Sequence, residues 1–138
     1  MKLLLLLTAL MLGTLPLQAA DQKTASPAAT PRVTNVSVDE AERLINEKKV
    51  VVLDVRTPEE FAQGHIAGAQ NFDFNDDRFA KDVAALDPKT PVLVHCAAGG
   101  RSTQSLEFLK DKLVVYHLKD GFKAWEKAGK SVETGKKK

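Results

Sequence analysis

The residues best suited to chemistry lie in one short run, His95-Cys96-Ala97-Ala98-Gly99-Gly100-Arg101-Ser102. Cys96 is the single cysteine of the chain. The thiolate form of cysteine is the nucleophile, and nearby positive charge and N–H donors favour it. Arg101 supplies the charge, and the small residues before it let the backbone curl so that successive N–H groups point at one spot. We therefore predict that Cys96 is reactive rather than an inert buried thiol, the commoner fate of a cysteine.

The loop after Cys96 is also suited to binding an anion. A helix is expected to start at Ser102, and its N-terminus adds unpaired N–H groups and partial positive charge. Amides of the loop would hold the oxygens of an anionic substrate or the outer sulfur of a persulfide, and these belong to Ala97, Ala98, Gly99, Gly100 and Arg101. Arg101 alone adds side-chain charge, which suits a small dianion.

Strand signals surround this loop. Continuous β-branched or apolar runs predict buried strands over residues 50–55, 92–95 and 114–118, and a weaker signal predicts a short strand over 69–72. Cys96 directly follows the strand 92–95. The residues Asp54 and Arg56 end the strand 50–55, so they are expected at the same edge of the sheet.

Helix signals alternate with the strands. Capping boxes at Ser37–Glu40 and Thr57–Glu60 start two helices, and Gly64 ends the second. Three further helices are predicted over residues 78–86, 102–113 and 122–128. This alternation predicts a single α/β domain with a small, mainly parallel sheet flanked by helices on both faces. Ligands bind at the carboxyl ends of the strands in such folds, which is where Cys96 lies.

Other polar residues near the loop have two interpretations. Arg56 either faces the anion or pairs with Asp54 to brace the loop, and the sequence leaves both open. Because side chains alternate along a strand, His95 is expected to face away from the pocket into which Cys96 points. His65 and His117 are interpreted as structural.

The N-terminus has the pattern of a secretory signal peptide over residues 1–19. Lys2 precedes an apolar run that is shorter than the roughly 20 residues of a membrane-spanning helix, and small residues follow it. We expect cleavage, a periplasmic location and no stable membrane insertion of the mature chain. Residues 20–34 are predicted to be a flexible linker, 35–130 the folded domain and 131–138 a basic tail.

The charge and composition argue against a nucleic acid partner. The formal charge is +2 at pH 7, and no basic stripe is interleaved with aromatic residues, so a nucleic acid partner is not expected. The chain is expected to be a monomer.

The sequence from about Asn35 to Gly129 resembles the rhodanese family. Four blocks in order carry the resemblance: Val52–Phe61, Gly64–Asn71, Cys96–Arg101 and Asp120–Trp125. The resemblance implies that Cys96 attacks the outer sulfur of thiosulfate, becomes a persulfide and passes that sulfur to cyanide or a thiol. The resemblance also implies that the partners are a small anionic sulfur donor and a thiophilic acceptor, and that the reaction needs no metal and no organic cofactor. The physiological donor and acceptor are left open.

Two alternative functions are compatible with a cysteine in such a loop. Cysteine-dependent phosphatases and arsenate reductases place one more residue between the cysteine and the arginine than the four between Cys96 and Arg101. The shorter loop suits a sulfur atom better than a phosphate. A non-catalytic rhodanese-like binding or sulfur-carrier module is the other alternative, and the retained cysteine and loop argue against it.

Overall fold

The computed structural model describes residues 32–112 and 114–135. The predicted signal peptide, most of the predicted linker, Leu113 and the three lysines at the end of the chain lie outside the described residues. Within the described part, no helix is long and apolar enough to cross a membrane.

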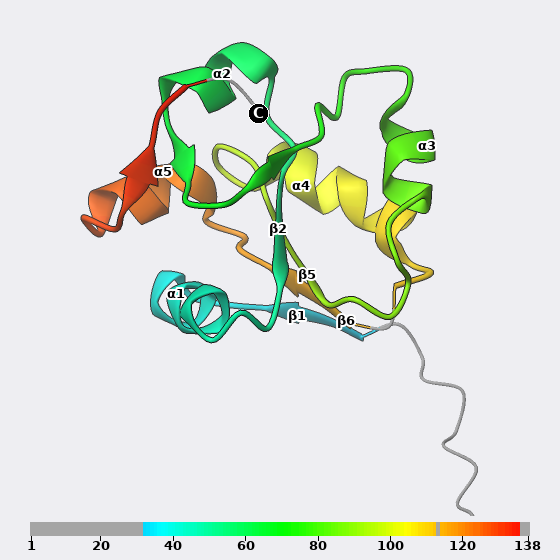
Figure 1. The fold of residues 1–138 in the computed structure, drawn as a ribbon, viewed down its shortest axis with the longest axis horizontal. Helices are drawn as coiled ribbons and strands as arrows, with labels where there is room; N and C mark the ends of the chain where they lie inside the picture. Colours follow the sequence, from blue (N-terminus) through cyan, green and yellow to red (C-terminus); the bar gives the residue numbers. More distant parts are fainter. Residues whose placement is uncertain (1–31, 113, 136–138) are drawn as a thin grey trace, which may run out of the picture.

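The described strands form two sheets (Figure 1). The main sheet has five parallel strands in the order β1-β6-β5-β2-β4. Their bounds are β1 Arg32–Asn35, β2 Val51–Asp54, β4 Gln70–Asn71, β5 Val92–His95 and β6 Val114–His117. A separate antiparallel pair joins β3 (His65–Ile66) to β7 (Val132–Glu133).

Within residues 32–112 and 114–135, six helical segments connect the strands. They are α1 Val38–Asn46, α2 Pro58–Gln63, α3 Phe79–Ala84, α4 Gly100–Ser105, the 3₁₀ helix η1 Leu106–Leu109 and α5 Gly121–Lys127. Both predicted N-caps are present, but the capping box predicted at Ser37–Glu40 is only half formed, because the Glu40 side chain accepts from Arg43 instead. The Ser37 side chain accepts from the Glu40 N–H, and Thr57 and Glu60 form a complete capping box at the start of α2.

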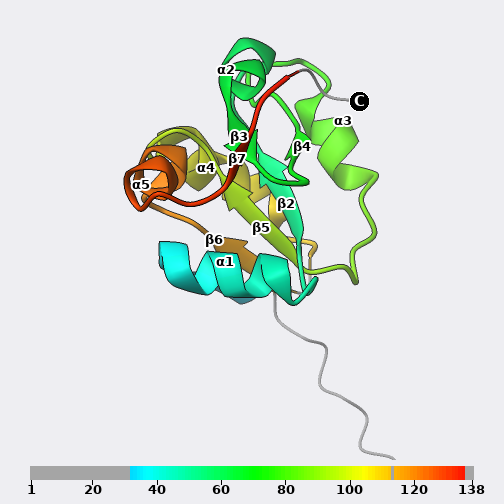
Figure 2. The same ribbon diagram turned by 60° about the vertical axis from the view of Figure 1, so that its left-hand side comes forward.

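Helices cover both faces of the main sheet, as predicted. On one face, Leu53 and Val94 pack against Phe79 and Val83 of α3 and against η1. On the other face, Val52 and Leu93 pack against α1 and α5. Figures 1 and 2 show α1 and α5 on one side of the sheet and α3 on the other. The central strands β5 and β2 are therefore buried on both faces, which explains their continuous apolar sequence.

The helix predicted over 102–113 is shorter and starts earlier. Gly99 caps it in the left-handed conformation, so α4 begins at Gly100 and gives way to η1 at Leu106. Side-chain hydroxyls of Thr103 and Ser105 donate to backbone carbonyls of the preceding turn, at 2.7 Å each. Such bonds compete with regular helix geometry, so the apolar spacing alone overestimated the helix.

Three strands were not predicted. β1 begins at Arg32, so residues 32–34 belong to the sheet rather than to the linker. All four residues of β1 are exposed, so it lacks the apolar run that marked the other strands. β3 and β7 have two residues each and pair only through the tertiary fold, and β7 lies within the predicted basic tail.

Candidate active site

Three neighbouring strands end beside Cys96. β5 lies between β6 and β2, and all three run in parallel. In this register Asp54 lies beside His95, and His117 lies beside Val94. The residues that follow the strands therefore meet at one edge of the sheet, where the sequence placed Cys96.

The start of α5 holds the first half of the Cys96–Arg101 loop. The carbonyl of Cys96 accepts from the Phe122 N–H at 2.8 Å, and that of Ala97 accepts from the Lys123 N–H at 3.0 Å. Gly121 permits this approach: its φ is +70°, and a Cβ there would lie 2.5 Å from the Ala97 oxygen. Because these two carbonyls point toward α5, the N–H groups that follow in the loop can point toward the sulfur.

Gly99 provides the turn that brings an N–H to the cysteine. Its φ is +95°, and a Cβ there would lie 2.3 Å from the Lys119 carbonyl oxygen. In this conformation the Gly99 N–H donates to Cys96 Sγ at 3.1 Å. Glycine is therefore required at position 99 for two reasons: its φ is positive, and there is no space for a Cβ.

Hydrogen bonds favour the thiolate of Cys96. Burial raises the pKa of this thiol, which is only 2% exposed, but the Ser102 hydroxyl and the N–H groups of Ser102, Ala98 and Gly99 more than offset burial. The net pKa lies below the ordinary cysteine value. The donors that reach the sulfur therefore come from the predicted loop and from the first turn of α4.

Ser102 is a site residue that the sequence reasoning missed. Its side chain is fully buried, and Oγ lies 3.5 Å from Cys96 Sγ and 3.2 Å from the Gly99 oxygen. Oγ also lies 2.9 Å from Nε2 of His117, which was interpreted as structural. The position of Ser102 one residue after Arg101, at the expected helix start, was the signal available in the sequence.

The Arg101 guanidinium lies against α2 rather than pointing freely into the loop. It donates to both carboxylate oxygens of Glu60, at 2.6 and 2.8 Å. These hydrogen bonds lower the pKa of Glu60 to about 2 and raise that of Arg101. The charge expected to bind an anion is therefore paired with a carboxylate in this structure.

Arg56 and Asp54 form a buried pair. The Arg56 guanidinium donates to Asp54 at 2.6 to 3.0 Å and to the Gly64 carbonyl at 2.7 Å, and it lies 4.0 Å from the centre of the Phe122 ring. Asp54 is fully buried, and Arg56 is 4% exposed. Arg56 therefore connects Asp54 to the residue that ends α2 and to α5, and its predicted contact with the anion stays a prediction.

The histidine before the cysteine points away from it. His95 is fully buried, its ring stacks near Phe122 on the α5 face, and Cys96 packs into the core on the opposite face. Burial lowers the pKa of His95 below its ordinary value. The alternation argument for His95 is confirmed.

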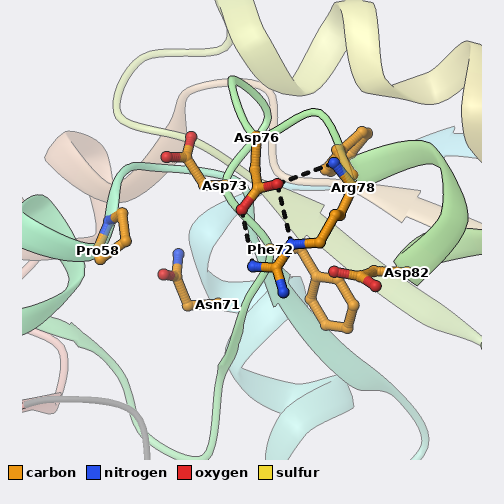
Figure 3. A pocket seen from close by; sticks show the side chains of 8 residues that line it. Pro58, Asn71, Phe72, Asp73, Asp76, Arg78 and Asp82 are labelled. Atoms are coloured by element: carbon orange, nitrogen blue, oxygen red, sulfur yellow. Dashed lines mark hydrogen bonds and ion pairs between the residues drawn. The ribbon is translucent and has the colours of Figure 1, made fainter.

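Two hollows lie near this end of the molecule. A pocket of about 170 Å³ adjoins the loop at Ala97 and is lined by Arg56, Glu60, Lys123 and other residues. A second pocket, of about 240 Å³, lies over α3 and the end of β4, away from the loop (Figure 3). There Arg78 folds onto Asp76 at 3.0 Å, with Asp82 beside them. Among the described residues, no cluster of His, Cys, Asp and Glu could hold a metal ion.

Comparison with known proteins agrees with this fold. The Rhodanese-like domain family matches residues 37–128. A rhodanese-related protein from Thermoplasma volcanium is 27% identical, with a TM-score of 0.64 over 72% of this chain and 96% of that one. A rhodanese-like domain protein from Staphylococcus aureus is also 27% identical, with a TM-score of 0.61 over 73% and 97%.

A third similar structure has a stated activity. The thiosulfate sulfurtransferase from Pseudomonas aeruginosa is 30% identical over 79% of this chain, with a TM-score of 0.62. The match covers 21% of that longer chain, so it corresponds to a part of that enzyme.

Proposed function

Because the chain belongs to the rhodanese-like domain family, we propose that it is a sulfurtransferase that carries sulfur as a persulfide on Cys96. The observation that carries this proposal is the environment of Cys96 Sγ. The sulfur lies at the carboxyl end of β5, accepts a hydrogen bond from the Gly99 N–H at 3.1 Å and has a pKa below its ordinary value. A thiolate held in this way is a prepared nucleophile.

In the first half-reaction the Cys96 thiolate attacks the outer sulfur of thiosulfate. A new sulfur–sulfur bond forms to Cys96, the bond inside thiosulfate breaks, and sulfite leaves with the electron pair. The N–H groups of Ala98 and Gly99 stabilise the negative charge near the reacting sulfur.

In the second half-reaction an acceptor takes the sulfur. Cyanide or an external thiolate attacks the outer sulfur of the persulfide, and Cys96 leaves as the thiolate. This chain contains a single cysteine, so no second thiol within it can take the sulfur. The acceptor must therefore come from another molecule.

Intact-mass measurement tests the proposal. The reduced protein, treated with thiosulfate, should gain the mass of one sulfur atom, and cyanide should remove it with release of thiocyanate. Cys96→Ser should gain none. A reduced, folded protein whose mass does not change with thiosulfate or with an organic persulfide donor would contradict the sulfurtransferase proposal. Hydrolysis of an aryl phosphate without sulfur uptake would favour the phosphatase alternative.

We also propose that the protein is exported and acts in the periplasm as a monomer. The support is the apolar segment after Lys2 and the small residues that follow it. Expression of the full chain in a bacterium should give a periplasmic protein whose N-terminus lies near residue 20. A full-length protein that stays in the cytoplasm or pellets with membranes would contradict export.

A further inference from the structure

A continuous chain of polar side chains runs from Cys96 to the sheet edge at β1. Ser102 Oγ lies 3.5 Å from Cys96 Sγ, and His117 Nε2 lies 2.9 Å from the same Oγ. On the other side of the ring, His117 Nδ1 lies 3.0 Å from Asn35 Oδ1. The four residues come from the end of β5, from α4, from β6 and from β1.

The acceptor on Asn35 determines where the protons lie. An amide oxygen only accepts, so Nδ1 of His117 carries a proton and, in the neutral ring, Nε2 is an acceptor. The Ser102 hydroxyl has one proton and three neighbours, of which His117 Nε2 is the nearest. Donation to His117 leaves lone pairs of Oγ for the thiol of Cys96. The arrangement therefore connects a proton donor to a base through one hydroxyl.

We infer that His117 is the proton acceptor for Cys96 and acts on it through Ser102. The Cys96 S–H bond breaks as its proton passes to Ser102 Oγ, and the hydroxyl proton passes to His117 Nε2. The products are a thiolate and an imidazolium, so charge balances. Ser102 then donates to the thiolate, Nε2–H donates to Ser102, and Nδ1–H still donates to Asn35. His117 touches no substrate and is a positioning residue in this scheme.

The surroundings of His117 keep it in the neutral form that can accept a proton. Its neighbours on other elements are the Ser102 hydroxyl of α4, the Asn35 amide of β1 and, through Ser102, the thiol of Cys96. Lys119 lies two residues after His117, just beyond the end of β6. Burial first, and then the charge of Lys119, lower the pKa of His117. The ring is thus neutral near pH 7 until a thiolate forms beside Ser102.

The inference deepens the proposed function, but its test does not depend on sulfur transfer. The pH dependence of Cys96 alkylation by iodoacetamide reports thiolate formation directly, and the single cysteine makes the readout unambiguous. Wild type should react in two steps with pH, because the thiol and the imidazole titrate as a coupled pair. His117→Gln should show one step at higher pH and react about tenfold more slowly near pH 7.

Glutamine separates proton acceptance from hydrogen bonding. Its amide oxygen can still accept from the Ser102 hydroxyl, as neutral His117 does, so a merely structural role would survive His117→Gln. Ser102→Ala should also give a single step, since it interrupts the path. His65→Gln is the matched control, because His65 stacks on Phe61 away from this chain, and it should keep the two-step profile. A two-step profile in His117→Gln or in Ser102→Ala would overturn the inference.

A second measurement applies even if His117→Gln fails to fold. The thiolate and the imidazolium stabilise each other, so removing one must change the pKa of the other. In a nuclear magnetic resonance titration, Cys96→Ala should lower the pKa of His117 by about one unit relative to wild type. An unchanged His117 titration would overturn the inference. If the protein takes up sulfur but the titrations of Cys96 and His117 are not coupled, only the inference about His117 is wrong. If the two titrations are coupled but no sulfur is taken up, only the proposed function is wrong.

Discussion

Arg101 and Glu60 form a bidentate ion pair that joins α4 to the start of α2. The guanidinium donates to the two carboxylate oxygens at 2.6 and 2.8 Å, and both side chains remain partly exposed. Glu60 also accepts from the Thr57 N–H as part of the capping box. The Glu60 carboxylate therefore completes a helix cap and also pairs with Arg101, the positive charge that was expected to bind an anion.

Neutralising Glu60 should increase the affinity for the sulfur donor. In Glu60→Gln the amide oxygen can still accept from Thr57, but the competing negative charge is gone. Because an exposed pair is worth less than about 1 kcal/mol, KM for thiosulfate should fall by about threefold, with kcat little changed. Steady-state kinetics over a range of thiosulfate concentrations measures both constants.

Glu59→Gln is the matched control for this effect. It removes the same charge from the neighbouring position of α2, and Glu59 is exposed. Its KM should stay near that of wild type. An equal fall of KM in both variants would mean that net charge, rather than release of Arg101, is responsible. A rise of KM in Glu60→Gln would mean that Arg101 must be held by Glu60 to bind the donor.

The same pair should contribute an acid-sensitive part of the stability. Hydrogen bonds from Arg101 lower the pKa of Glu60 from 4.5 to about 2. A carboxylate whose pKa is lower in the folded state stabilises the fold above its unfolded pKa, and this contribution is lost as the pH falls through the folded pKa. Wild type should therefore unfold at higher urea concentration than Glu60→Gln near pH 6, and the two midpoints should converge between pH 4.5 and about 2. A constant difference across that range would contradict this assignment.

Local patterns predicted the fold and the location of the site. Continuous apolar runs identified β2 and β5, because both strands are buried on two faces. The position of Cys96 directly after β5 then placed it at the carboxyl edge of a parallel sheet. The Gly99 N–H reaches the sulfur, as the curled loop suggested.

The partners of the site side chains could not be predicted in the same way. Arg101 and Glu60 are far apart in the sequence, and the capping box had already explained Glu60. The contact between Ser102 and His117 depends on the placement of α4 over β6, which no local pattern specifies. Long-range polar pairs of this kind depend on the packed fold rather than on propensity.

Gly99 should tolerate no side chain. Gly99→Ala places a Cβ 2.3 Å from the Lys119 oxygen on a residue with φ of +95°. A strained backbone and a steric overlap together should cost more than about 2 kcal/mol of the free energy of unfolding, measured by urea denaturation. The displaced N–H should also raise the pKa of the Cys96 thiol.

Gly100→Ala is the matched control in the same loop. Gly100 begins α4, its φ lies outside the left-handed range, and a Cβ there would meet nothing within 4 Å. Because alanine reduces the entropy of the unfolded chain, this variant should be as stable as wild type or gain up to about 1 kcal/mol. Equal losses in both variants would show that the loop rejects alanine for a reason other than the geometry of Gly99.

Asp54 should be far more important for stability than an exposed aspartate in a similar pair. Asp54→Asn leaves the buried Arg56 without its counter-charge, and breaking a buried pair on one side costs about 3–5 kcal/mol. Asp76→Asn breaks an exposed pair with Arg78 and should cost less than about 1 kcal/mol. Urea denaturation of the two variants measures the contrast.

The same variant tests whether Arg56 contacts the donor. If Arg56 braces the fold without touching the donor, Asp54→Asn should keep the wild-type KM for thiosulfate under conditions where it is folded. A KM for thiosulfate that differs from the wild-type value in a folded Asp54→Asn protein would instead place Arg56 among the groups that bind the anion.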